Sequence, residues 1–181
     1  MSDPPPGTDP PAADHGASGT GPADLGSFAE ALDGPMIVVT TVSGGQRSGC
    51  LVGFHTQCSM DPPRYAVALS KRNHTYRVAL GARVLGVSLL SESQVGIAEL
   101  FGGHTEDEPF DKFDHCEWVE GPAGVPLVSG AAAWIAGEVV ERVDVGDHVL
   151  FVVSPGLEEV ARPRQRALRF TRIESIEPGH P

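Results

Sequence analysis

Ser59-Met60-Asp61-Pro62-Pro63 lies between two apolar runs, and Ser70-Lys71-Arg72-Asn73-His74-Thr75 follows at the start of a predicted helix. The Pro-Pro turn joins two predicted strands, and the second strand delivers a polar loop to the N-terminus of that helix. The first N–H groups of a helix lack partners within it, and the helix dipole is positive at that end, so the junction favours an anion. The sequence therefore suggests a phosphate-bearing ligand here.

Length and charge narrow the class of protein. A chain of 181 residues can bury roughly two-thirds of its unfolded surface, so we expect one full-sized core. The net charge of −11 argues against nucleic-acid or anionic-membrane binding, because both depend on Lys and Arg. No apolar run reaches the roughly 20 residues that span a bilayer, and the N-terminus lacks a signal-peptide pattern. These features indicate a soluble cytoplasmic protein.

The first residues differ in composition from the rest of the chain. Residues 1–24 contain six prolines and four glycines and no Phe, Trp or Tyr. Such a segment cannot bury enough apolar surface to offset the entropy of ordering, so it is predicted to be a disordered tail. We expect one domain over residues 25–177 and a short C-terminal tail over residues 178–181.

Short runs rich in β-branched residues predict a mainly β fold. Turn residues at 43–46 and 144–147 each indicate a hairpin between neighbouring strands. Many short strands with hairpin connections and few helices are typical of a closed antiparallel barrel with short helical insertions. The predicted strands cover residues 36–42, 47–54, 65–69, 83–90, 134–143, 148–153 and 168–173.

Helical periodicity predicts short helices over residues 25–32, 73–80 and 94–101. In the first of these, Leu25, Phe28 and Leu32 share one face. In the second, the spacing of Tyr76 and Leu80 directs both side chains toward the core. We therefore expect each helix to pack its apolar side on the sheet.

Several common sites are absent from the sequence. It contains no G-x-G-x-x-G after a strand, no G-x-x-x-x-G-K-[ST] and no G-x-S-x-G, so Rossmann, P-loop and α/β-hydrolase proteins are disfavoured. Cys50, Cys58 and Cys116 are an odd number of cysteines, which indicates reduced thiols that pack as small apolar residues. His55 and Cys58 are three residues apart on a strand-like run and so face opposite sides. We therefore expect no metal site.

Four segments of this chain resemble the signature segments of the flavin reductase-like family. They occur in the family's order over about residues 36–173, and they are the residues 49–63, 70–75, 111–113 and 146–148. The resemblance implies a split antiparallel β-barrel of the FMN-binding split-barrel type, usually a homodimer. It further implies FMN or FAD bound near the subunit interface, reduction by NADH or NADPH, and supply of reduced flavin to a partner monooxygenase.

The resemblance also implies roles for particular residues. The segment along the isoalloxazine ring, whose backbone groups would meet the polar edge of the ring, consists of Cys50, Leu51, Val52, Gly53 and Phe54. Many relatives carry hydroxyl residues at the positions of Leu51 and Gly53, and Phe at the position of His55. The loss of these hydroxyls shifts hydrogen bonding with the ring toward backbone groups, and Gly53 permits a close approach.

The other implied roles concern the phosphate and the nicotinamide. The phosphate would be held at the helix start by Ser70, Lys71, Asn73 and Thr75. Lys112 and Phe113 would border the flavin, and His148 would contact the nicotinamide. Two simpler interpretations stay open, since Asn73 is also a good N-cap and residues 146–148 also fit a plain turn.

The sequence thus predicts an NAD(P)H-dependent flavin reductase that transfers a hydride from the nicotinamide to the flavin. One alternative is a flavoprotein that retains FMN and reduces another acceptor, such as a quinone, a ferric complex or a protein. The other is a non-catalytic flavin-binding redox module. The apolar run over residues 131–135 is the expected contact of a homodimer.

Overall fold

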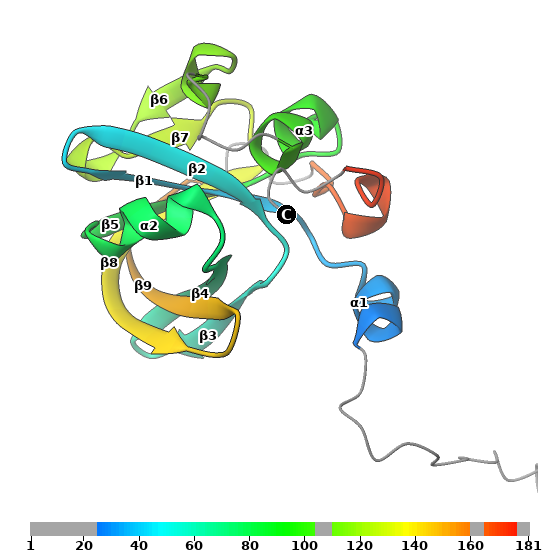
Figure 1. The fold of residues 1–181 in the computed structure, drawn as a ribbon, viewed down its shortest axis with the longest axis horizontal. Helices are drawn as coiled ribbons and strands as arrows, with labels where there is room; N and C mark the ends of the chain where they lie inside the picture. The colour runs from blue at the N-terminus through cyan, green and yellow to red at the C-terminus, as the bar shows by residue number, and fades with distance from the viewer. Residues whose placement is uncertain (1–24, 104–109, 160–164, 177–181) are drawn as a thin grey trace, which may run out of the picture.

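The computed structural model describes residues 25–103, 110–159 and 165–176, so the expected tails lie outside the described residues. Its main feature is a seven-stranded antiparallel sheet in the order β2-β1-β5-β8-β9-β4-β3, which curves into a barrel (Figure 1). The strands are β1 (Ile37–Ser43), β2 (Gln46–Val52), β3 (His55–Met60), β4 (Pro63–Ser70), β5 (Val84–Leu89), β8 (Ala133–Asp144) and β9 (His148–Glu159). The prediction of a mainly β, split antiparallel barrel with short helices is confirmed.

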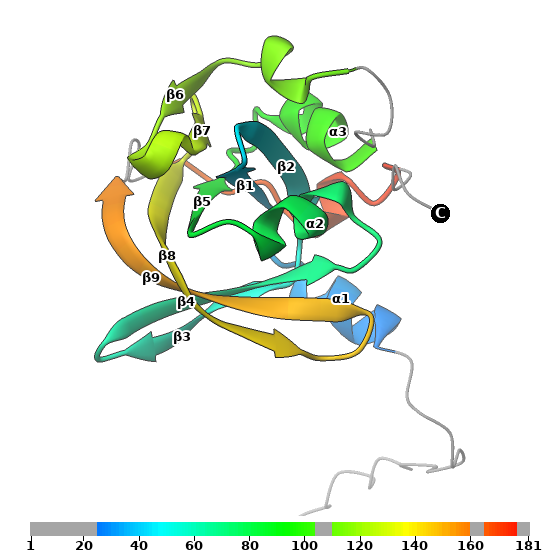
Figure 2. The same cartoon turned by 60° about the vertical axis from the view of Figure 1, so that its left-hand side comes forward.

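Smaller elements surround this barrel. A two-stranded sheet of β6 (Trp118–Glu120) and β7 (Pro126–Val128) lies beside β5 and β8 (Figure 2). The helices are α1 (Gly26–Leu32), α2 (His74–Leu80) and α3 (Val95–Gly103). Single 3-10 turns form η1 (Lys112–Asp114), η2 (Pro122–Gly124) and η3 (Phe170–Arg172).

Strand β1 is apolar on both faces because the core lies on both of its sides. Ile37 and Val39 belong to the barrel interior, together with residues of β4, β5 and β9. Met36 and Val38 point the other way, into a second cluster that includes Phe101 of α3. Alternate side chains of a strand face opposite sides of the sheet, so an unbroken apolar run fits a strand that is buried on both faces.

The edge strands of the sheet, β2 and β3, follow one another in the chain. Gly53-Phe54 joins them, and the Phe54 carbonyl accepts a hydrogen bond from Ala68 N at 2.9 Å. The predicted hairpin at residues 43–46 is present, and Gly44 and Gly45 have φ angles of 58° and 80°. Both angles lie in the left-handed region that a two-residue hairpin turn requires. The predicted hairpin between β8 and β9 is also present.

The C-terminal segment is not the strand that its apolar residues predict. Residues 168–173 instead form one bridge between Pro35 and Arg169, followed by the turn η3. Leu168 is nevertheless buried, and its carbonyl accepts a hydrogen bond from Met36 N at 2.8 Å. Leu168 and Ile173 are both buried, so apolar side chains anchor this segment without a full strand ladder.

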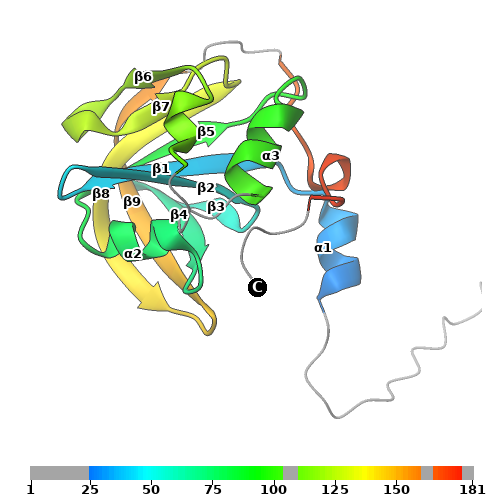
Figure 3. The same ribbon diagram turned by 45° about the horizontal axis from the view of Figure 1, so that its top comes forward.

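Two predicted helix faces differ from expectation. Helix α1 lies beside the turn η3 (Figure 3), where Asp33 accepts hydrogen bonds from Thr171. Its residues Leu25, Phe28 and Leu32 are 67%, 63% and 63% exposed, so this face does not pack on the sheet. In α2 the buried residues are Thr75, Val78 and Ala79, whereas Leu80 is exposed. Periodicity gave the helices correctly, but it could not decide which side of each helix meets the sheet.

Candidate functional site

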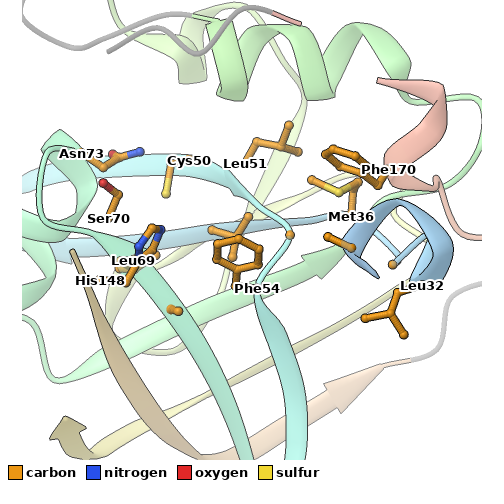
Figure 4. A pocket seen from close by; sticks show the side chains of 15 residues that line it. Leu32, Met36, Cys50, Leu51, Phe54, Leu69, Ser70, Asn73, His148 and Phe170 are labelled. Carbon is orange, nitrogen blue, oxygen red and sulfur yellow. The ribbon is translucent and has the colours of Figure 1, made fainter. Parts of the chain in front are cut away.

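A cavity of about 360 Å³ opens where the barrel is split, beside the step from β2 to β3 (Figure 4). Residues far apart in the chain meet in its wall. They come from α1, the start of β1, strands β2 and β4, the start of β9, and η3. Those that the sequence suggested are Cys50, Leu51, Val52, Gly53, Phe54, Ser70, Asn73 and His148.

The cavity is polar at one end and apolar at the other. Figure 4 shows Ser70, Asn73 and His148 together at one end. Leu32 and Phe170 lie at the opposite end, near Met36. The volume lies within the range of about 300–1,000 Å³ that small-molecule sites occupy, and an apolar cavity with a few grouped polar atoms is the usual form of such sites. This arrangement suits an elongated ligand with an apolar ring system and a polar tail.

The β2 wall presents mainly backbone and apolar side chains to the cavity. Cys50 and Val52 are buried and belong to the barrel interior. Phe54 is 62% exposed, and its ring meets the ring of His148 edge-on with centroids 5.4 Å apart. Because a Cβ at Gly53 would meet only Met36 side-chain atoms at 3.6 Å, this part of the wall is open rather than crowded.

His148 is held by the residue before it. Its Nδ1 lies 2.8 Å from Oδ1 of Asp147, and this hydrogen bond keeps the pKa of Asp147 below its usual range. A carboxylate can only accept, so Nδ1 carries the proton and the neutral ring keeps Nε2 as an acceptor. Strand pairing sets His148 opposite Ser70, which places both at the polar end of the cavity.

Only two of the four residues predicted to hold a phosphate line the cavity. Asn73 lines the cavity, but its Oδ1 also accepts from Thr75 N at 2.9 Å and so caps α2. Thr75 is buried, and its hydroxyl lies 2.9 Å from Oγ of Ser48. Lys71 Nζ binds both carboxylate oxygens of Asp144, at 2.9 and 2.8 Å. Ser70 and Asn73 thus reach the cavity, whereas Lys71 and Thr75 have partners outside its lining.

Lys112 and Phe113 are likewise not brought to the lining of the cavity. The Lys112 side chain is buried, and its Nζ donates to the carbonyl of Gly49 at 3.1 Å. Phe113 packs edge-on against Phe101, with ring centroids 5.6 Å apart. Both therefore support β2 from the side of α3. Residues 104–109, which precede them in the chain, lie outside the described ranges.

Sequence reasoning missed the apolar end of the cavity. Its residues come from the segments that precede and follow the strands, and they include Ala29, Leu32, Gly34, Met36 and Phe170. No local motif connects α1 with η3, which are more than a hundred positions apart in the chain. The available signal was the apolar face formed by Leu25, Phe28 and Leu32, which the sequence placed against the sheet and the structure leaves exposed.

Within residues 25–103, 110–159 and 165–176 there is no group of three or more His, Cys, Asp or Glu side chains placed to hold a metal ion. Cys58 is exposed rather than packed, in contrast to Cys50. Among the described helices, none has the length and apolar character needed to cross a membrane.

The family model described as "Flavin reductase like domain" matches residues 29–160. The ferric-chelate reductase (NAD(P)H) of Archaeoglobus fulgidus is 37% identical over 119 residues, which are 65% of this chain and 70% of that protein. The reductase subunit of a flavin-dependent monooxygenase from Mycobacterium tuberculosis is 29% identical over 157 residues, or 85% of this chain and 80% of that subunit. The match spans only 37% of a probable flavin reductase and 56% of a stachydrine N-demethylase reductase subunit, both of Rhizobium meliloti.

Solved structures share the fold of this chain. An FMN-binding protein from Thermus thermophilus superposes with a TM-score of 0.72 and 26% identity, covering 83% of this chain and 85% of that one.

Proposed function

The chain belongs to the flavin reductase-like family, and on that premise we propose that it is an NAD(P)H-dependent flavin reductase whose flavin occupies the cavity at the split of the barrel. The observation that carries this proposal is the cavity itself, with apolar walls and one polar end. The flavin, FMN or FAD, supplies the hydride-accepting ring, so the protein needs little acid–base chemistry of its own.

The cavity fits such a group in size and in chemistry. Cys50, Leu51, Val52 and Gly53 offer a wall of backbone and apolar groups against which a planar ring can lie. Ser70 and Asn73 are our candidates for the phosphate, since both lie at the polar end. Lys71, Thr75, Lys112 and Phe113 are proposed only as supports, because none of them lines the cavity in the described structure.

His148 is our candidate for the residue that positions the nicotinamide. Its Nδ1 donates to Asp147, which fixes the ring and directs Nε2 as a hydrogen-bond acceptor. Its edge-on contact with Phe54 further orients the imidazole at the cavity rim. An acceptor held in this way suits the carboxamide N–H of a nicotinamide. The main contribution is the correct geometry for transfer rather than proton transfer.

A second acceptor deserves a separate test. The relative from Archaeoglobus fulgidus is named a ferric-chelate reductase, which favours a variant in which the flavin stays bound and electrons pass to a ferric complex. Purified protein that stays yellow through gel filtration and reduces ferric chelates faster than added free flavin would support this second function. Rapid turnover of added flavin by colourless protein supports the first one.

Partners follow from the same family membership. Several relatives are named reductase components of monooxygenases, so we propose that reduced flavin passes to such an enzyme. A cytoplasmic location fits Cys58 and Cys116, neither of which forms a disulfide in the described part of the chain. The test of function is NADH and NADPH oxidation with FMN, FAD and riboflavin each supplied in turn, with flavin reduction followed anaerobically.

We also propose a homodimer, with a different contact from the one the sequence suggested. Ala131 and Ala132 are buried inside the chain, so only Ala133, Trp134 and Ile135 of the 131–135 run are partly exposed. Leu25, Phe28 and Leu32 at α1 are exposed apolar side chains, of which Leu32 also lines the cavity, and they are the better candidates. Sedimentation should give twice the chain mass of 19.0 kDa, and Phe28→Asp should reduce it to a monomer.

A further inference from the structure

His55, the first residue of β3, is tied to two segments at once. Its Nε2 lies 2.8 Å from the carbonyl oxygen of Pro35, and its Nδ1 lies 2.6 Å from the hydroxyl of Tyr65. The ring also stacks on Tyr65, with centroids 5.8 Å apart. The carbonyl can only accept, so Nε2 carries a proton, and in the neutral ring Nδ1 accepts the Tyr65 hydroxyl proton.

The surroundings keep both partners uncharged. Burial lowers the pKa of His55, with a smaller opposing effect from the Pro35 hydrogen bond, and burial raises the pKa of Tyr65. His55 therefore acts at neutral pH as a fixed donor to Pro35 and a fixed acceptor from Tyr65. The arrangement is a defined hydrogen-bond chain from β4 through β3 to the start of β1.

The hydrogen bond between His55 and Pro35 joins two segments that both line the cavity. Gly53 and Phe54 line it and directly precede His55 in sequence. Gly34 and Met36 also line it and flank Pro35 on either side. The bond therefore ties the start of β3 to the segment before β1, two strands that are not neighbours in the sheet order.

The Pro35 segment is also held by other contacts. Gly34 O accepts from Phe170 N at 3.0 Å, and Pro35 forms a bridge with Arg169. The pairing of Ile37 with Val52 holds Met36 near Gly53. The hydrogen bond from His55 adds a tie at Pro35 itself, and this tie begins on the residue next to Phe54.

We propose that His55 is a positioning residue that sets the width of the apolar end of the flavin cavity through its hydrogen bond to Pro35. This inference rests on the proposed function, since it takes the ligand to be a flavin ring. It assigns to His55 no contact with the ligand. Without the bond, the Gly34–Pro35 step samples wider positions, and the ligand must order it on binding.

The experiment compares His55→Phe with two matched variants. His55→Phe keeps an aromatic ring but removes both hydrogen bonds. Tyr65→Phe removes only the phenolic hydroxyl and leaves the hydrogen bond from His55 to Pro35 in place. His115→Phe is the control, since His115 is exposed and stacks on Phe110 away from the cavity lining. Dissociation constants for FMN and riboflavin are measured by quenching of flavin fluorescence, well below the unfolding midpoint of every variant.

The expected result is a threefold to tenfold weaker binding of both flavins by His55→Phe, the range of roughly one net hydrogen bond. The affinities for FMN and riboflavin should fall equally, because the hydrogen bond from His55 to Pro35 lies away from the polar end of the cavity. Tyr65→Phe and His115→Phe should stay within about twofold, and KM for NAD(P)H at saturating flavin should be unchanged in all three. A merely structural role would lower the unfolding midpoint of His55→Phe without moving either dissociation constant, and that result would overturn the inference.

A second measurement reads the state of the ring directly. In the full-length protein, the ¹⁵N shifts of His55 should show a protonated Nε2 and an unprotonated Nδ1 at pH 7.5. A protonated Nδ1 with a bare Nε2 would overturn the inference, because Pro35 would then lack its donor. If the wild-type chain bound no flavin at all, the proposed function would fail instead, whatever the tautomer of His55.

Discussion

Replacing Asn73 by Asp separates its role in the helix from its proposed role toward a phosphate. Asn73 has an extended backbone, with φ −75° and ψ 137°, and its Oδ1 caps α2 through Thr75 N. Asp caps a helix about as well as Asn, so the fold should keep its stability. The substitution does, however, place a negative charge at the polar end of the cavity.

The size of the effect follows from Coulomb's law. Two unit charges about 5 Å apart repel by about 1–3 kcal/mol for effective dielectric constants between about 80 and 20. FMN should therefore bind roughly fivefold to 150-fold more weakly to Asn73→Asp, whereas riboflavin, which has no phosphate, should change by less than about twofold. Because salt screens such charges, the loss should shrink between low and high ionic strength.

The assay is the quenching of flavin fluorescence, with both flavins titrated at two salt concentrations and unfolding followed for each variant. Asn73→Ala serves as the comparison, since it removes the cap and should cost about 1 kcal/mol of stability without adding a charge. If FMN and riboflavin lost affinity equally in Asn73→Asp, the phosphate would not lie at this end of the cavity and the reasoning would be refuted.

Three further predictions concern other parts of the chain. His148→Ala should raise KM for NAD(P)H, with about a 5- to 150-fold loss of kcat/KM, and leave flavin affinity within a few-fold. If stopped-flow flavin reduction showed unchanged nicotinamide kinetics, His148 would not position the nicotinamide. Gly137→Ala should lower stability by about 3 kcal/mol, because the added Cβ would lie 2.0 Å from the backbone oxygen of Ser154, and an unchanged melting temperature would contradict this. Burial lowers the pKa of His55 in the folded state, so only the unfolded chain gains a proton on this residue as the pH falls below about 6.5. The unfolding free energy should therefore fall by at most about 1.4 kcal/mol per pH unit, until the pH reaches the folded pKa of His55. An equal slope in His55→Phe would show that His55 does not cause this pH dependence.

Much of the barrel could be predicted from local patterns. Turn residues and β-branched runs predicted β1, β2, β4, β5 and β8 to within about two residues, whereas β9 starts as predicted at His148 but runs on to Glu159 instead of ending at residue 153. Such signals are local, because they depend on backbone conformation and on alternation along one strand. Strand β3 was harder to recognise because it is an edge strand made of largely polar residues.

The site was predictable only in part, for the same reason. The residues from Cys50 to Phe54 and His148 lie in recognisable segments, and the structure brings them to one cavity. The apolar end depends instead on α1 meeting η3, a contact between distant segments that no spacing encodes. The burial of Lys112 was equally hidden, since a lysine in a polar loop is ordinarily solvated and only the fold shows its bond to Gly49.

The most direct test of the central claim is an anaerobic titration of the purified chain with NADH and NADPH in the presence of FMN, FAD or riboflavin. The account predicts bleaching of the flavin absorbance at about 450 nm in proportion to the nicotinamide oxidised, one hydride for each flavin, and a flavin affinity that falls in Asn73→Asp only for phosphate-bearing flavins. Nicotinamide that stays unoxidised with every flavin, although the wild-type chain is folded, would contradict the claim that this chain is a flavin reductase.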